Sequence, residues 1–167
     1  MTPPTNGIAI AAARFITLLF GGLYAGFLLA VLFLEATLRG ATAEVYVVVQ
    51  HVKHANLDLL ATATITPTIV GGVLLLLLVR PWRSRPLALS AVGLLCILVA
   101  LATTLLVNVP INAAQLGWSP QAPPANWVAV RDRWQTAHAL RTALAILALS
   151  CQLLAVGRLT GWEREVG

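Results

Sequence analysis

Four long apolar runs, separated by short polar segments, dominate the pattern of positions along the chain. Three of them carry no charged residue at all: 15–34, 59–79 and 87–107. A helix of about 20 residues, rising about 1.5 Å per residue, crosses the roughly 30 Å hydrocarbon layer of a bilayer. The fourth run, 142–157, reaches that length only when His138 and Arg141 are included. The pattern predicts an all-α protein, an integral membrane four-helix bundle.

We expect a single transmembrane domain over residues 1–167, with spans at approximately 12–35, 57–79, 87–109 and 137–157. The composition agrees, because 59% of the residues are hydrophobic and only 10% are charged, whereas a soluble domain carries about 25% charged residues. A water-soluble fold is therefore excluded, and the lipid bilayer is the expected surrounding. The basic residues lie in gaps between the apolar runs and form no patch with aromatic residues, so nucleic acid is not an expected partner.

The cations in the short loops predict the orientation in the membrane. With four spans, both termini and the second loop lie on one side, which holds Arg14, Arg80, Arg83, Arg85, Arg158 and Arg164. The opposite side holds the smaller set Arg39, Lys53, Arg131 and Arg133. Because cytoplasmic loops carry an excess of Lys and Arg, we expect both termini in the cytoplasm of a bacterial cell, with loops one and three facing outward. The sequence leaves a homo-oligomer open.

Polar residues gather near the outer ends of the predicted helices. In the third helix Thr104, Asn108, Asn112 and Gln115 follow spacings of four, four and three, so they share one face. Asparagine in hydrocarbon is costly unless it is hydrogen-bonded, which favours a face that looks into the bundle. Pro110 removes a backbone donor between the two asparagines. The helix therefore either kinks there and lines a pocket, or frays into loop three with both asparagines as caps.

The fourth helix carries Trp134, His138 and Arg141 on one face, at spacings of four and three. Arg141 lies about one turn inside the span, where a charge costs a few kcal/mol unless it snorkels or finds a partner. In one interpretation Arg141 snorkels to the headgroups and His138 lies at the interface. In the other, both point inward at a ligand, with Glu35 or Asp58 as counter-ion.

These segments together resemble the anthrone oxygenase family, whose members are small four-span membrane proteins, many of them of unknown function. The resemblance rests on Asn108-Val109-Pro110-Ile111-Asn112, Trp118, Trp127, Arg133-Trp134 and His138-Ala139-Leu140-Arg141-Thr142. Length and span number are similar along the whole chain, and the specific motif covers about residues 104–142. Characterised members oxidise anthrones to anthraquinones in aromatic polyketide pathways. The resemblance therefore implies a monooxygenase that acts on a hydrophobic aromatic small molecule.

Such a reaction needs a base, a donor for the oxyanion, and an apolar slot for dioxygen and the flat substrate. An anthrone anion can pass an electron directly to dioxygen, so we expect dioxygen as co-substrate and no cofactor. His138 is the predicted base, because the unperturbed pKa of histidine lies near neutrality, and Arg141 is predicted to stabilise the oxyanion. The predicted substrate-binding residues are Thr104, Asn108, Asn112, Trp118 and Trp134.

Two alternatives stay open. His51, His54 and Asp58 share one face if they are helical, and His138 could complete a metal shell, since imidazole with carboxylate suits copper, iron or zinc. This arrangement, which is not part of the family pattern, predicts a metal-dependent membrane oxidoreductase. The second alternative is a non-catalytic small-molecule carrier or accessory membrane subunit. A carrier would favour an ionisable residue near mid-membrane, whereas Glu35 and Asp58 lie at helix ends.

Overall fold

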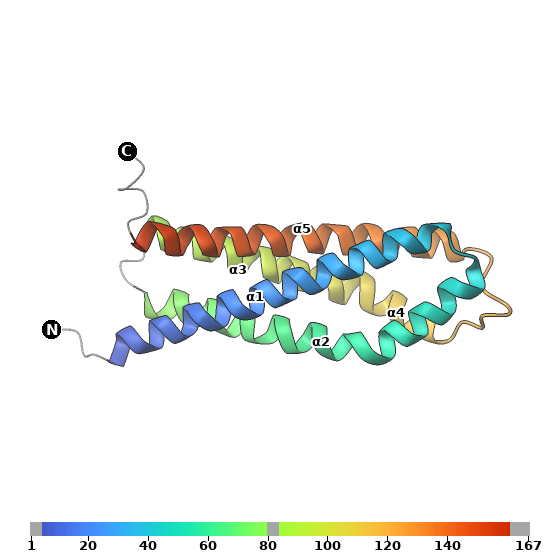
Figure 1. Ribbon diagram of the computed structural model, residues 1–167, viewed down its shortest axis with the longest axis horizontal. Helices are drawn as coiled ribbons and strands as arrows, with labels where there is room; N and C mark the ends of the chain where they lie inside the picture. Colours follow the sequence, from blue (N-terminus) through green and yellow to red (C-terminus); the bar gives the residue numbers. More distant parts are fainter. Residues whose placement is uncertain (1–4, 80–83, 161–167) are drawn as a thin grey trace.

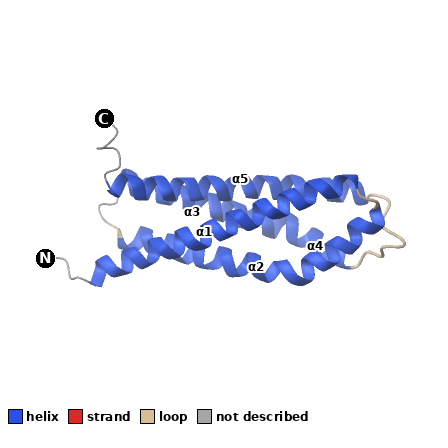
Figure 2. Ribbon diagram, viewed as in Figure 1, coloured by secondary structure: helices blue, strands red, loops and turns tan. Residues whose placement is uncertain are grey.

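The computed structural model describes residues 5–79 and 84–160, which form a bundle of long helices (Figure 1). The helices are α1 (Thr5–Thr37), α2 (Ala43–Leu78), α3 (Arg85–Thr103), α4 (Val109–Leu116) and α5 (Trp127–Thr160). A 3-10 helix, Leu38–Gly40, follows α1, and a π-helical turn, Thr104–Asn108, joins α3 to α4. Within the described residues there is no strand (Figure 2). The predicted all-α class is confirmed.

Four helical segments are long and apolar enough to cross a membrane: Gly7–Gly40, Leu57–Leu78, Arg85–Leu116 and Trp127–Gly157. Only 33–39% of the residues in their most apolar parts are buried inside the bundle. Large apolar side chains face outward, as Leu59 and Leu106 do at 79% and 75% exposure. An apolar surface of this extent needs a lipid surrounding. The predicted integral membrane four-helix bundle is confirmed.

The helices follow one another around the bundle, so that α2 and α5 lie diagonally opposite. α1 packs against α2 and α5, and α3 packs against the same two helices. The first turns of α1 and the last turns of α5 lie at one end (Figure 1). The opposite end, which carries the α1–α2 connection and residues 117–126, is called the distal end. Three of the cations that predict the orientation, Arg80, Arg83 and Arg164, lie outside the described residues, and so does the side chain of Arg158.

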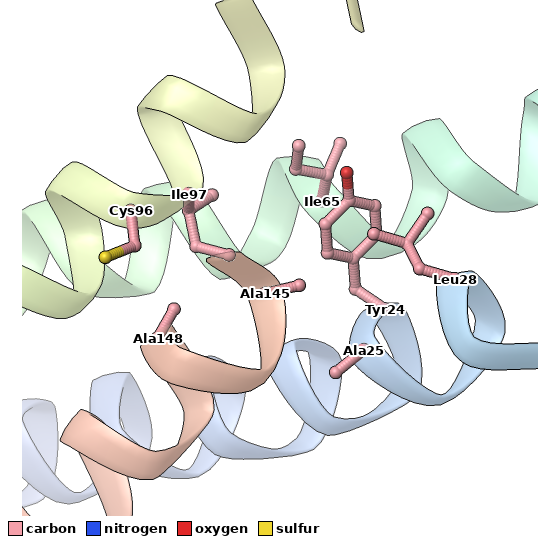
Figure 3. Close-up of a cluster of buried hydrophobic side chains, with 8 residues drawn as sticks. All are labelled: Tyr24, Ala25, Leu28, Ile65, Cys96, Ile97, Ala145 and Ala148. Atoms are coloured by element: carbon pink, nitrogen blue, oxygen red, sulfur yellow. The ribbon is translucent and has the colours of Figure 1, made fainter. Parts of the chain in front are cut away.

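A cluster of buried apolar side chains from α1, α2, α3 and α5 fills the middle of the bundle (Figure 3). Its members are Tyr24, Ala25, Leu28, Ile65, Cys96, Ile97, Ala145 and Ala148. Beside it α3 and α5 approach closely, because a Cβ atom on Gly93 would lie 3.1 Å from the carbonyl oxygen of Ala148. In lipid, where association depends on close packing, such small residues hold helices together.

Two helices, α2 and α5, begin ten or more residues earlier than the apolar pattern predicts. α2 begins at Ala43 and not at residue 57, because the Thr42 side chain accepts a hydrogen bond from the Val45 N–H at 3.4 Å. Glu44 lies in the first turn, where the helix dipole favours a negative charge. Most of the predicted loop one is therefore helix. α5 likewise begins at Trp127 and not at residue 137.

The third helix continues through Pro110 into α4. The Val109 N–H donates to the Thr104 carbonyl oxygen five residues back, so a π-turn forms directly before the proline. Asn108 makes no side-chain cap hydrogen bond and is completely buried. Asn112 lies inside α4. The interpretation in which both asparagines cap a frayed helix end is therefore wrong.

Candidate functional site

A cavity of about 160 Å³ lies between the helices in the distal half of the bundle. Its apolar wall includes Phe27 and Val31 from α1 and Val109 from α4. The contribution of α2 consists of Lys53, His54, Leu57, Asp58, Ala61 and Thr62. The Asp58 side chain is 61% exposed, so the cavity opens to the outside beside it.

Arg141 reaches the cavity from α5 and is held by neutral partners. Its Nε and Nη2 donate to Nδ1 of His138 at 3.0 and 2.8 Å, and its Nη1 donates to the Thr104 hydroxyl at 3.1 Å. Arg141 is only 8% exposed. Of the ion pairs formed between described residues, none includes Arg141. The guanidinium thus brings an unpaired positive charge to the cavity wall.

His138 is completely buried, and both of its ring nitrogens are engaged. A guanidinium only donates, so His138 Nδ1 must accept from Arg141. The ring proton is then on Nε2, which donates to the Leu28 carbonyl oxygen at 3.0 Å. The ring also stacks on Trp134 with 4.9 Å between centroids. His138 does not belong to the described residues that line the cavity, and it supports Arg141 from behind.

Trp134 forms an aromatic wall of the cavity. Its Nε1 donates to Oδ1 of Asn112 at 2.6 Å, and its carbonyl oxygen accepts from Nδ2 of Asn108 at 3.2 Å. The Lys53 Nζ lies 3.8 Å from the ring centroid, and the Arg141 Cζ lies 5.7 Å from it. Cation–π attraction to this ring therefore stabilises two positive charges beside the cavity.

Lys53, unlike Arg141, has a carboxylate partner. Its Nζ forms an ion pair with the completely buried Glu35. The same carboxylate accepts from Gln50 Nε2 at 2.9 Å and from Gln135 Nε2 at 3.1 Å. Burial lowers the pKa of Lys53 from its usual value, and the ion pair opposes this shift. Glu35, expected as a counter-ion of Arg141, pairs with Lys53 instead, which corrects the sequence interpretation.

His54 lines the cavity with one ring nitrogen that has no hydrogen-bond partner. Its Nε2 lies 3.2 Å from Oε1 of Gln115, and the Gln115 Nε2 donates to the Tyr46 hydroxyl at 2.9 Å. Its Nδ1 is buried and without a hydrogen bond, 3.7 Å from Oδ1 of Asp58. Burial is the main cause that lowers the pKa of His54 below its usual value of 6.5. The ring is therefore neutral at pH 7.

The residues of the metal alternative do not come together. His51 Nε2 lies 3.0 Å from the backbone carbonyl oxygen of Gln115. Across residues 5–79 and 84–160, no group of three or more His, Cys, Asp or Glu side chains could hold a metal ion. The predicted ligand set of His51, His54, Asp58 and His138 is therefore not assembled.

Three of the five predicted substrate-binding residues line the cavity, namely Thr104, Asn112 and Trp134. Asn108 lies behind the cavity wall, where it bonds the Trp134 backbone. Trp118 lies in residues 117–126, and the described cavity lining does not include it. The structure therefore does not bring Trp118 to the site.

Three α2 residues of the cavity wall, Lys53, Leu57 and Ala61, are the part of the site that the sequence interpretation missed. Lys53, Leu57 and Ala61 recur every four residues, and His54 and Asp58 lie directly beside them, as expected for one helix face. This signal was present in the sequence. The apolar pattern predicts a loop over residues 43–56, and there Lys53 is interpreted only as a loop cation.

The fold and this site define a class of protein, a membrane-spanning four-helix bundle with a cation-lined cavity near one end. Comparison with protein families shows that residues 56–151 match the family described as Anthrone oxygenase. Because the match covers more than half of the 167 residues, the chain belongs to the anthrone oxygenase family. Lys53 and His54 precede the matched segment. Neither the curated proteins nor the solved structures give a match.

Proposed function

We propose that this protein is a cofactor-free membrane oxygenase that oxidises an anthrone-like or related phenolic polyketide with dioxygen. The observation that carries the proposal is the unpaired guanidinium of Arg141. A charge at this depth costs several kcal/mol unless something compensates it. The partners Thr104 and His138 are neutral groups. An anionic ligand in the cavity supplies the missing charge.

The anion of an anthrone fits this cavity chemically. It is flat and apolar, and its negative charge is delocalised onto the carbonyl oxygen, which can approach Arg141. Trp134 contributes an aromatic ring to the cavity wall, and the amide nitrogen of Asn112 is a donor for a peripheral hydroxyl group. A cavity of roughly 150 Å³ holds one benzene ring. The central ring can therefore be enclosed while the outer rings extend toward the opening beside Asp58.

The reaction needs no external reductant. Loss of a methylene proton gives the anion, which passes one electron to dioxygen, and the resulting radical pair combines into a carbon–oxygen bond. The peroxide then loses water as its O–O bond and the second methylene C–H bond break. One oxygen atom becomes the quinone carbonyl and the other becomes water. All four electrons taken up by dioxygen come from the methylene carbon.

Within this proposal Arg141 stabilises the oxyanion and His138 positions Arg141. Accepting two hydrogen bonds at its Nδ1, His138 fixes the plane of the guanidinium. This geometry favours a positioning role over the role of base that the sequence predicts for His138. We further propose that both termini lie in the cytoplasm, which puts the cavity in the outer half of a cell membrane.

The test uses purified protein in liposomes, supplied with anthrone in air and a metal chelator. Dioxygen uptake and anthraquinone absorbance are followed together against protein-free liposomes. Removing one positioned oxyanion donor costs about 10²–10³ in kcat, so Arg141→Met should lose at least that much. Arg141→Lys keeps the charge without the planar fork and should lose activity in part. Arg133→Met, which removes an exposed arginine from the same helix, is the matched control.

Stability distinguishes a functional arginine from a structural one. Because Arg141→Met removes an unpaired buried charge, its melting temperature should equal or exceed that of the wild type. Wild-type turnover of anthrone no faster than in protein-free liposomes, or an Arg141→Met variant as active as Arg133→Met, would contradict the proposal.

A further inference from the structure

His54 lines the cavity, and one buried nitrogen of its ring has no hydrogen-bond partner. Buried polar atoms almost always have a hydrogen-bond partner, and His54 is only 7% exposed. Its Nδ1 has none, since Oδ1 of Asp58 at 3.7 Å is beyond hydrogen-bond distance. The atom is therefore available to a ligand in the cavity.

The hydrogen bonds around Gln115 determine which His54 nitrogen carries the proton. The Gln115 amide nitrogen donates to the Tyr46 hydroxyl, so the amide oxygen faces His54 Nε2. An amide oxygen only accepts, and Nε2 must therefore carry the hydrogen. His51 bonds the backbone carbonyl oxygen of Gln115 and helps to hold it in place. The remaining nitrogen, Nδ1, keeps a lone pair without a hydrogen bond, in a ring that lines the cavity.

We propose that His54 is the base that removes the methylene proton, held by Gln115 in the tautomer that leaves Nδ1 free. This inference rests on the proposed function and deepens it. His138 is less suited to the task, because Arg141 and the Leu28 carbonyl already occupy its two nitrogens.

The positions of the two groups match the geometry of the substrate. His54 belongs to α2 and Arg141 to α5, which lie diagonally across the bundle. In an anthrone the methylene and the carbonyl lie at opposite corners of the central ring. A substrate placed between α2 and α5 can therefore present its methylene to His54 and its carbonyl oxygen to Arg141.

His54 accepts and later returns the first methylene proton. The C–H bond breaks, its electron pair enters the ring system, and the proton moves to His54 Nδ1. Asp58, 3.7 Å away, stabilises the imidazolium that forms. His54 then returns this proton to the terminal oxygen of the peroxide. As the O–O bond and the second methylene C–H bond break, this oxygen takes the second methylene proton and leaves as water.

Three parallel substitutions test the inference in the liposome assay: His54→Gln, His138→Gln and, as the control, Arg133→Met. Glutamine at position 54 can still donate to Gln115 but has no basic nitrogen. General base assistance is worth about 10²–10⁴-fold, so His54→Gln should lower kcat by that factor. It should leave unchanged the binding of an ionised hydroxyanthraquinone, which has no methylene to deprotonate. Arg133→Met, at an exposed position away from the cavity wall, should retain wild-type activity, whereas His138→Gln should weaken binding as well as turnover.

The pH dependence of kcat gives a second test, because a residue with a merely structural role would not change it. The groups that face His54 are Lys53 and Asp58 on its own helix, Gln115 on α4 and, across the cavity, Arg141. Because a protonated imidazole cannot act as a base, wild-type kcat should fall as the pH drops below 6.5 and through the lowered pKa of His54. The residual activity of His54→Gln should lack this decline.

The outcomes separate the two proposals. Wild-type kcat in His54→Gln, beside an inactive Arg141→Met, overturns the assignment of the base and leaves the proposed function intact. An equal loss of kcat and of hydroxyanthraquinone binding in His54→Gln would give His54 a binding role. This result would also overturn its assignment as the base. A wild type that does not accelerate anthrone oxidation refutes the proposed function, and this inference with it.

Discussion

The buried ion pair between Glu35 and Lys53 predicts a large and pH-dependent stability effect. Glu35→Ala leaves the Lys53 ammonium in a side chain that is 5% exposed, and it also removes the acceptor of Gln50 and Gln135. Removing one partner of a buried ion pair costs about 3–5 kcal/mol. We expect Glu35→Ala to lower the free energy of unfolding in detergent micelles by that amount at pH 7.

A double substitution separates the unpaired charge from the loss of packing. Replacing a whole buried pair by apolar groups is neutral or stabilising by about 1–4 kcal/mol, so Glu35→Ala with Lys53→Met should recover most of the loss. The control is the more exposed pair of Arg131 and Asp132, at 3.0 Å with side chains 11% and 50% exposed. Asp132→Ala should cost less than about 1 kcal/mol.

Raising the pH should also rescue Glu35→Ala. Glu35 raises the pKa of Lys53 and burial lowers it, so removing Glu35 depresses this pKa further. Between that lowered pKa and the usual value of 10.5, the unfolded chain binds more protons than the folded one, and stability must rise with pH. Unfolding titrations at pH 7 and pH 10 measure this. The reasoning fails if Glu35→Ala is no worse than Asp132→Ala, or if the double variant is as unstable as the single one.

Two further predictions concern packing and orientation. Gly93→Leu should lower the free energy of unfolding by about 1–3 kcal/mol, because its Cβ would meet the Ala148 carbonyl oxygen at 3.1 Å. Gly22→Ala is the control: a Cβ at Gly22 would have nothing within 4 Å, so this variant should be neutral in the same titration. A cysteine at exposed Ala122 should react with a membrane-impermeant thiol reagent on intact cells, since the two native cysteines are buried. Labelling at Ser84→Cys with Ala122→Cys silent would reverse the orientation.

The fold was predictable because hydrocarbon imposes a simple rule on the sequence. A span must be apolar over its whole length, so the uncharged runs locate the membrane-crossing parts of the helices directly. The same rule predicts nothing about helical segments that lie outside the membrane. α2 continues for more than three turns before residue 57, and its buried positions Tyr46, Val47, Gln50, Lys53 and His54 recur at helical spacing. Periodicity, and not hydropathy alone, was the signal for this part.

The candidate site was predictable only where its residues share one helix. Trp134, His138 and Arg141 follow spacings that place them on one face, and the structure brings them into contact. The partners supplied by other helices were not predictable from spacing. The Leu28 carbonyl, which fixes the His138 tautomer, belongs to α1 and has no side-chain signature. Gln115, which orients His54, lies on the predicted polar face of the third helix, but its spacing does not identify a partner on α2.

The distinction that matters most for function is between two buried cations that look alike in the sequence. Lys53 and Arg141 both contact Trp134 and both line the cavity. The carboxylate of Glu35 neutralises Lys53, so this charge is already compensated inside the protein. Arg141 bonds only neutral groups. Because an uncompensated charge in a membrane span is costly, we propose that an anionic ligand compensates Arg141. The pairing of Glu35 with Lys53 leaves the Arg141 guanidinium without a carboxylate partner and so available for this ligand.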